Sequence, residues 1–224
     1  MKDRMGTSEK KFDCWSISII VWSVIIGLTT FYLLVKFGTE DQKYNKEKEF
    51  FTMTIDKNYP GLVPDGDHYQ FIGDLITAGD LHIKINLIVR GRIKVGGSIL
   101  SLGFITVSGD IMSGGKIKTH GRIGSGASIT SGGFIYSGDK IVTFDWIEAG
   151  GDIEAINNIR CGDHITARGN VTAGGDIQVD KRLEAGGDVK AGGDIKTIDG
   201  VRAGGKIQAG GKITGKTTCQ YSDI

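Results

Sequence analysis

The sequence predicts an all-β fold: a three-sided parallel β-helix of about eight 18-residue coils of hexapeptide repeats, preceded by one N-terminal transmembrane α-helix. Three observations predict it. An aliphatic residue recurs every six positions from Leu75 to Ile213, a small residue follows it two positions later, and a 22-residue run without charge extends from Cys14 to Val35. We expect five regions: a short polar tail (1–13), the transmembrane helix (14–35), a charged juxtamembrane linker and β-helix cap (36–74), the β-helix (75–218) and a C-terminal tail (219–224).

The six-residue period is unbroken over 24 successive positions, all of which hold Ile, Leu or Val. These three residues make up roughly a fifth of ordinary sequence, so chance does not explain the array. The residue two positions on is small in every hexad except at Ile83. Because residues i and i+2 of a strand point to the same face, each hexad places one aliphatic and one small residue inward, as in Ile147-Glu148-Ala149.

Glycine marks the corners between hexads, and its distribution sets the number of sides. The chain has 36 glycines and only 2 prolines, both before Asp65. Glycine accepts a positive φ at a tight corner, and strand N–H groups must bond the neighbouring coil, which excludes proline. In every third hexad the fifth position is glycine without exception, from Gly79 to Gly205, whereas the other two sets are mixed. An 18-residue period therefore overlies the six-residue one and predicts three sides with different corners.

The uncharged run 14–35 predicts the membrane anchor. A helix of this length is about 33 Å long and crosses a hydrocarbon core of about 30 Å. Trp15 and Tyr32 lie near its ends, as interfacial aromatic residues do. The alternatives are a buried core helix and a cleaved signal peptide, but the run is long and no A-x-A-like site follows it. Four basic residues flank each side, so the chain is expected to be a single-pass membrane protein with the side of the β-helix undecided.

The segments IEAGGDIEA and VTAGGDIQVDKRLEAGGDVKAGGDIK resemble bactofilins, which are polymer-forming bacterial cytoskeletal proteins with a right-handed, three-sided β-helix. The resemblance covers residues 75–218 and rests on the repeat pattern. It implies nucleotide-free, end-to-end assembly into filaments. The chain departs from the family in its long N-terminal apolar run and its regular Gly-Gly-Asp corners. Left-handed hexapeptide acyltransferases share the period, but their small residue precedes the aliphatic one by two positions.

No catalytic constellation is found in the sequence. The charge is nearly balanced, with 27 basic and 26 acidic residues, which gives no reason to expect nucleic acid as a partner. The four histidines fall at different hexad positions, so they do not stack into a metal triad, and the three cysteines are far apart. No G-x-S-x-G motif occurs. Residues 210–217, GGKITGKT, match the letters of the P-loop pattern, but they continue the six-residue period instead of joining a strand to a helix, as a P-loop does. We therefore expect a protein that is not an enzyme and has no cofactor, metal or small-molecule substrate.

The Gly-Gly-Asp corners have two interpretations. They resemble part of the calcium-binding nonapeptide repeat, but the period here is six rather than nine. Asp188 and Lys206 lie one coil apart, as do Asp194 and Lys212. This spacing favours a ladder of surface charges along the rod, with little free energy in each pair.

Two surfaces are candidates for contacts with other molecules. The first contains four aromatic residues at outward or corner positions of one coil, namely Phe134, Tyr136, Phe144 and Trp146. They predict either a lateral contact or simple shielding of the corners. The second is the C-terminal coil, where Ile207 and Ile213 are the inward residues best placed to meet a second molecule. The tail after it is too short for a capping helix, whereas residues 50–74 are long enough to cover the first coil.

These observations predict a membrane-anchored structural scaffold whose β-helix self-associates through its ends. The expected partners are a second copy of the chain and the membrane. The asymmetry of the two ends favours C-terminal to C-terminal dimers, with filaments if the N-terminal cap moves aside. The alternative is an extracytoplasmic adhesion or binding rod in which the β-helix is a rigid spacer. Membrane topology and end-to-end polymerisation distinguish the two functions.

Overall fold

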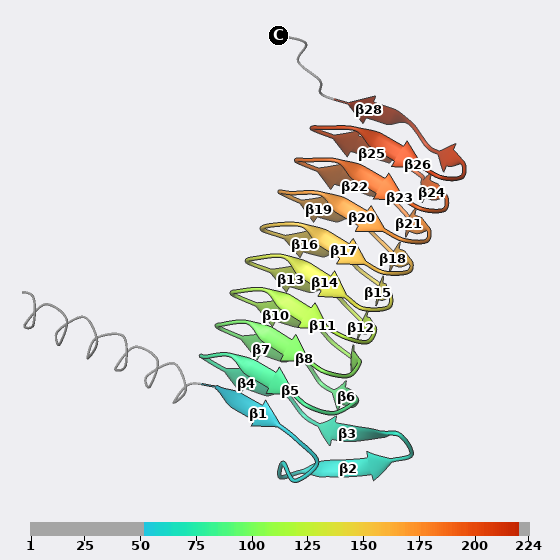
Figure 1. Cartoon of the computed structure of the whole chain (residues 1–224). Helices are drawn as coiled ribbons and strands as arrows, with labels where there is room; N and C mark the ends of the chain where they lie inside the picture. The colour runs from blue at the N-terminus through green and yellow to red at the C-terminus, as the bar shows by residue number, and fades with distance from the viewer. Residues whose placement is uncertain (1–51, 220–224) are drawn as a thin grey trace, which may run out of the picture. The chain divides into compact units, whose positions relative to one another are not determined.

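The computed structural model describes residues 52–219, and all regular structure in this range is β-strand. Strands β1 to β28 wind into a parallel solenoid of three sheets and about eight coils (Figure 1). The predicted all-β, three-sided architecture is therefore confirmed for this range. The predicted transmembrane helix, 14–35, lies outside the described residues. Within 52–219 there is no helix with the length and apolar character needed to span a bilayer.

Each side of the solenoid is one sheet, labelled A, B or C below. Sheet A contains, in spatial order, β1 (Met53–Ile55), β5 (Leu81–Ile83), β8 (Ile99–Ser101), β11 (Ile117–Thr119), β14 (Ile135–Ser137), β17 (Ile153–Ala155), β20 (Val171–Ala173), β23 (Val189–Ala191) and β26 (Ile207–Ala209). Sheet B contains β2 (Leu62–Asp65), β3 (His68–Ile72), β6 (Leu87–Arg90), β9 (Ile105–Val107), β12 (Ile123–Ser125), β15 (Ile141–Thr143), β18 (Ile159–Cys161), β21 (Ile177–Val179), β24 (Ile195–Thr197) and β27 (Ile213–Thr214). Sheet C contains β4 (Leu75–Thr77), β7 (Ile93–Val95), β10 (Ile111–Ser113), β13 (Ile129–Ser131), β16 (Ile147–Ala149), β19 (Ile165–Ala167), β22 (Arg182–Ala185), β25 (Gly200–Ala203) and β28 (Thr217–Cys219).

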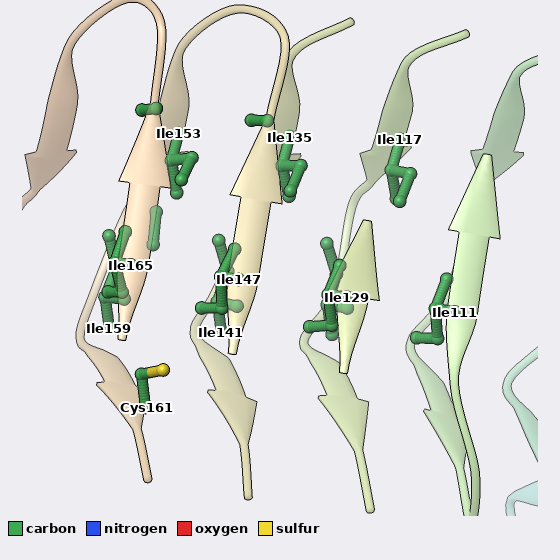
Figure 2. Close-up of a cluster of buried hydrophobic side chains, with 14 of the residues drawn as sticks. Ile111, Ile117, Ile129, Ile135, Ile141, Ile147, Ile153, Ile159, Cys161 and Ile165 are labelled. Atoms are coloured by element: carbon green, nitrogen blue, oxygen red, sulfur yellow. The ribbon is translucent and has the colours of Figure 1, made fainter. Parts of the chain in front are cut away.

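Strand pairing confirms the 18-residue coil. Ile135 pairs with Ile153 in sheet A, and Ile147 pairs with Ile165 in sheet C, each 18 residues apart and parallel. The aliphatic side chains point inward and stack coil upon coil (Figure 2). From Leu75 to Val201 each is at most 2% exposed. Burial of one such side chain contributes roughly 1.5–3 kcal/mol before chain entropy is subtracted, so the stacked columns are the main source of stability.

The second inward position holds buried hydroxyl groups in the middle of the rod. Ser125 Oγ donates to the carbonyl oxygen of Gly109 at 2.7 Å, and Ser131 Oγ donates to that of Gly115 at 2.7 Å. Both acceptors lie in the corner of the preceding coil. Since buried polar groups need partners, these bonds explain why serine is tolerated in an otherwise apolar interior.

The corner glycines adopt no positive φ, so the conformational reason given above for their presence is wrong. Within 52–219, positive φ occurs only at five glycines outside the Gly-Gly corners: Gly61, Gly66, Gly73, Gly200 and Gly215. The corner glycines are instead required by close stacking. A Cβ atom on Gly150 would lie 2.1 Å from the carbonyl oxygen of Gly132, one coil below. No side chain fits at that distance unless the backbone moves.

The N-terminal end carries strands that extend sheets A and B beyond the first complete coil. Strand β1 pairs with β5, and β3 pairs with β6 in the 18-residue register that joins Tyr69 to Leu87. Strand β2 folds back antiparallel on β3 through a two-residue turn, in which Gly66 has a φ of 62°. A positive φ at the first central residue is typical of a type II′ hairpin turn. The rings of Tyr59 and Phe71 meet edge to face, with centroids 6.1 Å apart, beside the core at this end.

The register changes in the last turn of the C-terminal end. Gly215, with a φ of 117°, shortens the final corner, so that Thr217 pairs with Val201. The 18-residue period would have placed Cys219 opposite Val201, but Cys219 pairs with Ala203 instead. The inward aliphatic column of sheet C therefore ends on a threonine.

Candidate functional site

A ladder of side-chain oxygens runs along the corner between sheets C and A. Asp152 Oδ1 accepts a hydrogen bond from the backbone N–H of Asn170 at 2.7 Å, and Asn170 Oδ1 accepts one from that of Asp188 at 2.7 Å. Asp188 Oδ1 in turn accepts from the backbone N–H of Lys206 at 2.7 Å. A second ladder joins Asn158, Asp176, Asp194 and Lys212 along the corner between sheets A and B.

These contacts correct the predicted ladder of surface charges. The partner of Asp188 is the backbone of Lys206 rather than its ammonium group, and in the described range no ion pair joins these two side chains. The carboxylate also covers the glycine next to that amide, because a Cβ on Gly205 would lie 2.0 Å from Asp188 Oδ1. In the Gly-Gly-Asp corner the glycines thus allow successive coils to approach closely, and the aspartate joins the coils by a hydrogen bond. Residues 52–219 hold no group of three His, Cys, Asp or Glu side chains placed to bind a metal ion.

The four aromatic residues form two separate pairs. Phe134 and Tyr136 lie at the C–A corner and on the outer face of sheet A, where Lys116 Nζ is 5.7 Å and Lys118 Nζ is 5.5 Å from the respective ring centroids. These distances are within the range of cation–π attraction. A shallow hollow of about 280 Å³ borders this pair and is also lined by Asp152.

Phe144 and Trp146 lie at the corner between sheets B and C. The Trp146 ring stacks on His164 of the next coil, with centroids 6.1 Å apart and an interplanar angle of 9°. Phe144 has no ring partner among the described residues and is 75% exposed. It borders a hollow of about 420 Å³ on the outer face of sheet B, at the level of Gly124. Phe144 is therefore the most exposed of the four aromatic side chains, since Phe134 and Trp146 are each 38% exposed.

Cys161 is an interior residue and not a nucleophile. It is 0% exposed, and its Sγ donates to the carbonyl oxygens of Asp145 at 2.9 Å and His164 at 3.2 Å. Burial raises the pKa of the Cys161 thiol from 9.0 to about 11. Because the thiolate is the reactive form, this thiol is inert near neutral pH. It takes the place of the buried hydroxyl groups of Ser125 and Thr143, which donate to the same corner in the two preceding coils.

The C-terminal end of the rod is less well covered than its interior. Ile207 and Ile213 are only half-buried, although the equivalent residues one coil earlier, Val189 and Ile195, are 0% exposed. Strands β26, β27 and β28 are the outermost strands of sheets A, B and C at this end. Each presents a row of backbone groups that no other described strand pairs. The predicted self-association residues thus lie together in the last coil, on open sheet edges.

At the N-terminal end of the rod, the outermost strand of sheet B is less suited to pairing than the open edges of the C-terminal end. It is β2, and Pro64 within it has no N–H to offer to a further strand. Proline in an edge strand discourages pairing with another chain.

The sequence analysis did not predict the aspartate ladders or the separation of the four aromatic residues into two pairs. The ladders had a signal, since Asp or Asn recurs at the corner position every 18 residues.

Comparisons with protein-family profiles, with curated proteins and with solved structures found no match.

Proposed function

We propose that the chain is a membrane-anchored structural scaffold whose β-helix self-associates through its ends into nucleotide-free filaments. The observation that carries the proposal is the open C-terminal coil, where three sheet edges and two half-buried isoleucines, Ile207 and Ile213, occur together. The uncharged run 14–35 supports the anchor, and the resemblance of the repeats to bactofilins supports filament assembly.

The physical reason for association is the same one that stacks the coils. A terminal coil leaves one side of its aliphatic side chains and its backbone hydrogen-bonding groups without a neighbour, whereas every interior coil has two. A second rod that stacks on this end supplies the missing neighbour. Each half-buried isoleucine then gains up to about 1 kcal/mol from the apolar surface it loses to water.

Sedimentation velocity of the full chain in a non-ionic detergent tests the proposal. We expect the wild-type protein to form species larger than one chain per micelle, without added nucleotide. Ile213→Lys should abolish these species, because it places an ammonium group on the contact surface. Thr214→Lys is the matched control, since Thr214 is the adjacent outward residue of the same coil and is exposed. It should assemble like the wild type.

Three outcomes would contradict the scaffold function. A wild-type chain that stays monomeric at high concentration would rule out association through the end and favour the rigid-spacer alternative, in which the exposed Phe144 is a lateral contact. Equal assembly of Ile213→Lys and Thr214→Lys would place the contact elsewhere. Assembly that requires nucleotide would exclude a nucleotide-free filament.

A further inference from the structure

The two ends of the rod stop at different levels in the three sheets. At the N-terminal end, β1 and β3 extend sheets A and B one strand beyond the first complete coil, but sheet C stops at β4. At the C-terminal end the relation is reversed, because sheet C has one strand more, β28, beyond β26 and β27. The step is visible in Figure 1, where β28 projects beyond the other strands. Within residues 52–219, the N-terminal end therefore has no sheet C strand at the level of β1 and β3, and the C-terminal end has one strand more in sheet C than in sheets A and B.

The two ends also carry opposite charge. Residues 52–80 contain five aspartates and one lysine, whereas residues 200–219 contain four basic side chains and no carboxylate. Lys206, Lys212 and Lys216 are exposed at the last corners and make no ion pair within 52–219. Asp67, in the turn between β2 and β3, has its side chain 86% exposed.

We propose that the rods associate head to tail, with β28 of one copy pairing with β4 of the next copy, at an edge of sheet C that no other described strand covers. This inference rests on the proposed self-association and adds its direction and partner surface. The three strands β28, β1 and β3 then make one complete coil from two chains. Lys206 and Lys212 of the first chain face the acidic end of the second. A contact between two C-terminal ends would instead bring like charges together, which disfavours it.

The inward columns continue across this contact. With β28 beside β4, Ile207 of the first chain stacks against Met53 of the next chain in sheet A, and Ile213 stacks against Tyr69 in sheet B. Met53 and Tyr69 both pack at the margin of the core of their own chain. In sheet C, Thr217 of the first chain stacks against Leu75 of the next. Each of these residues occupies the inward position in its own chain, so the stacking rule that builds the rod also holds across the contact.

Strand β2 must leave β3 as the contact forms, since it lies at the level that β27 of the preceding rod takes. It is suited to leave. Only Leu62 of its four residues is half-buried, and the other three, Val63, Pro64 and Asp65, are exposed. In the free chain β2 covers the edge of sheet B, and Pro64 prevents it from pairing with a further strand. This strand acts as a removable cover on the N-terminal end.

The salt dependence of assembly distinguishes head-to-tail contact from contact between two C-terminal ends. Attraction between opposite charges weakens as salt shortens the screening length, which is about 10 Å at 0.1 M. We expect the association constant of the full chain in non-ionic detergent to fall at least about tenfold between about 0.05 M and about 0.5 M salt. Contact between like-charged ends would strengthen over the same range, and that result would overturn the proposal while leaving self-association intact.

Charge reversal gives a second test by the same sedimentation assay. Variant K carries Lys206→Glu, Lys212→Glu and Lys216→Glu, and variant D carries Asp56→Lys, Asp65→Lys and Asp67→Lys. Each variant alone should associate at least about tenfold more weakly than the wild type, because the two ends of its rod then carry net charge of the same sign. An equimolar mixture should recover assembly, since the ends are again complementary.

The control for variant K is Lys94→Glu, Lys190→Glu and Lys196→Glu. It changes the net charge equally on the sides of the rod and should assemble as the wild type does. All variants should keep the wild-type melting temperature within a few degrees, because the reversed side chains are surface groups. The head-to-tail contact is wrong if mixing variants K and D does not restore assembly. It is also wrong if the control with reversed charges on the sides of the rod assembles as poorly as variant K. If the wild type itself stays monomeric, the proposed function fails first.

The displacement of β2 is tested by a disulfide between Val63→Cys and Gln70→Cys, which are directly paired residues of β2 and β3. In a Cys14→Ser, Cys219→Ser background, the oxidised chain should stay monomeric and the reduced chain should assemble. Assembly of the oxidised chain would show that β2 remains in place and would overturn this contact.

Discussion

The side chain of Asp188 accepts a hydrogen bond from the backbone N–H of Lys206, 18 residues later, with Oδ1 2.7 Å from the amide nitrogen. The amide belongs to a corner, where the chain leaves one sheet and no neighbouring strand supplies a carbonyl group. The carboxylate therefore satisfies a donor that the sheet ladder leaves out. The same geometry recurs from Asp194 to Lys212. Asp188 and Asp194 thus join successive coils through the backbone, whereas the corner residue Asp163 pairs with the ammonium group of Lys181 at 2.8 Å.

Asp188→Ala should lower the free energy of unfolding by about 1 kcal/mol, because the Lys206 amide loses its acceptor. Asp188→Asn should be close to the wild type, since asparagine performs this role at Asn158 and Asn170 in other coils. Urea denaturation measures both. If Asn is as destabilising as Ala, the carboxylate acts through its charge, and the backbone ladder is not its main role.

Gly150→Ala should destabilise the protein by about 2 kcal/mol or more, because the new methyl group would lie 2.1 Å from the Gly132 carbonyl oxygen. Gly124→Ala is the matched control. A Cβ on Gly124 would point outward from sheet B and lie 3.5 Å from Thr106, which is ordinary contact. It should be neutral or slightly stabilising. Equal melting temperatures for the two variants would contradict close stacking as the reason for the corner glycine.

Ile153→Asp should unfold the rod or cost several kcal/mol, because it places a carboxylate without a partner in a column that is 0% exposed. Glu154→Asp changes the neighbouring outward residue and should be nearly silent. Thermal denaturation followed by circular dichroism compares them. The inward assignment would be wrong if the two variants melted together.

The buried thiol of Cys161 should make stability fall as the solution becomes alkaline. Its pKa is raised from 9.0 to about 11 in the folded chain, so between these values the unfolded chain has lost the proton and the folded chain keeps it. The unfolded state is therefore favoured progressively over this range, by on the order of 2 kcal/mol at the upper end.

Cys161→Ser isolates this effect, since a serine hydroxyl can donate to the same two carbonyl groups and does not ionise in this range. The difference in unfolding free energy between wild type and Cys161→Ser should change with pH above 9.0 and be constant below it. A difference that is independent of pH would show that the folded thiol ionises normally. In a Cys14→Ser background, a thiol reagent at neutral pH should modify Cys219, which is exposed, and spare Cys161.

The repeat determined most of the fold, because a six-residue period with two inward positions has few ways to bury its aliphatic side chains. Ile153 is inward and Glu154 outward in any arrangement that stacks the hexads, and the glycine pattern was sufficient to give three sides. The strand register joining Ile135 to Ile153 followed from the same period. These features depend on local spacing alone.

Only the tertiary structure decided what occupies each corner and each end. Gly150 and Asp188 looked like turn-forming and charged residues in the sequence, but their roles come from atoms one coil away, the Gly132 carbonyl oxygen and the Lys206 amide. Likewise, the shortening at Gly215 and the return of β2 on β3 decide where each sheet stops. The period continues through a stack of identical coils, but it contains no information about where the stack ends. The levels of β28 and β4 are set by single breaks in the period, whose effect appears only when the coils are stacked.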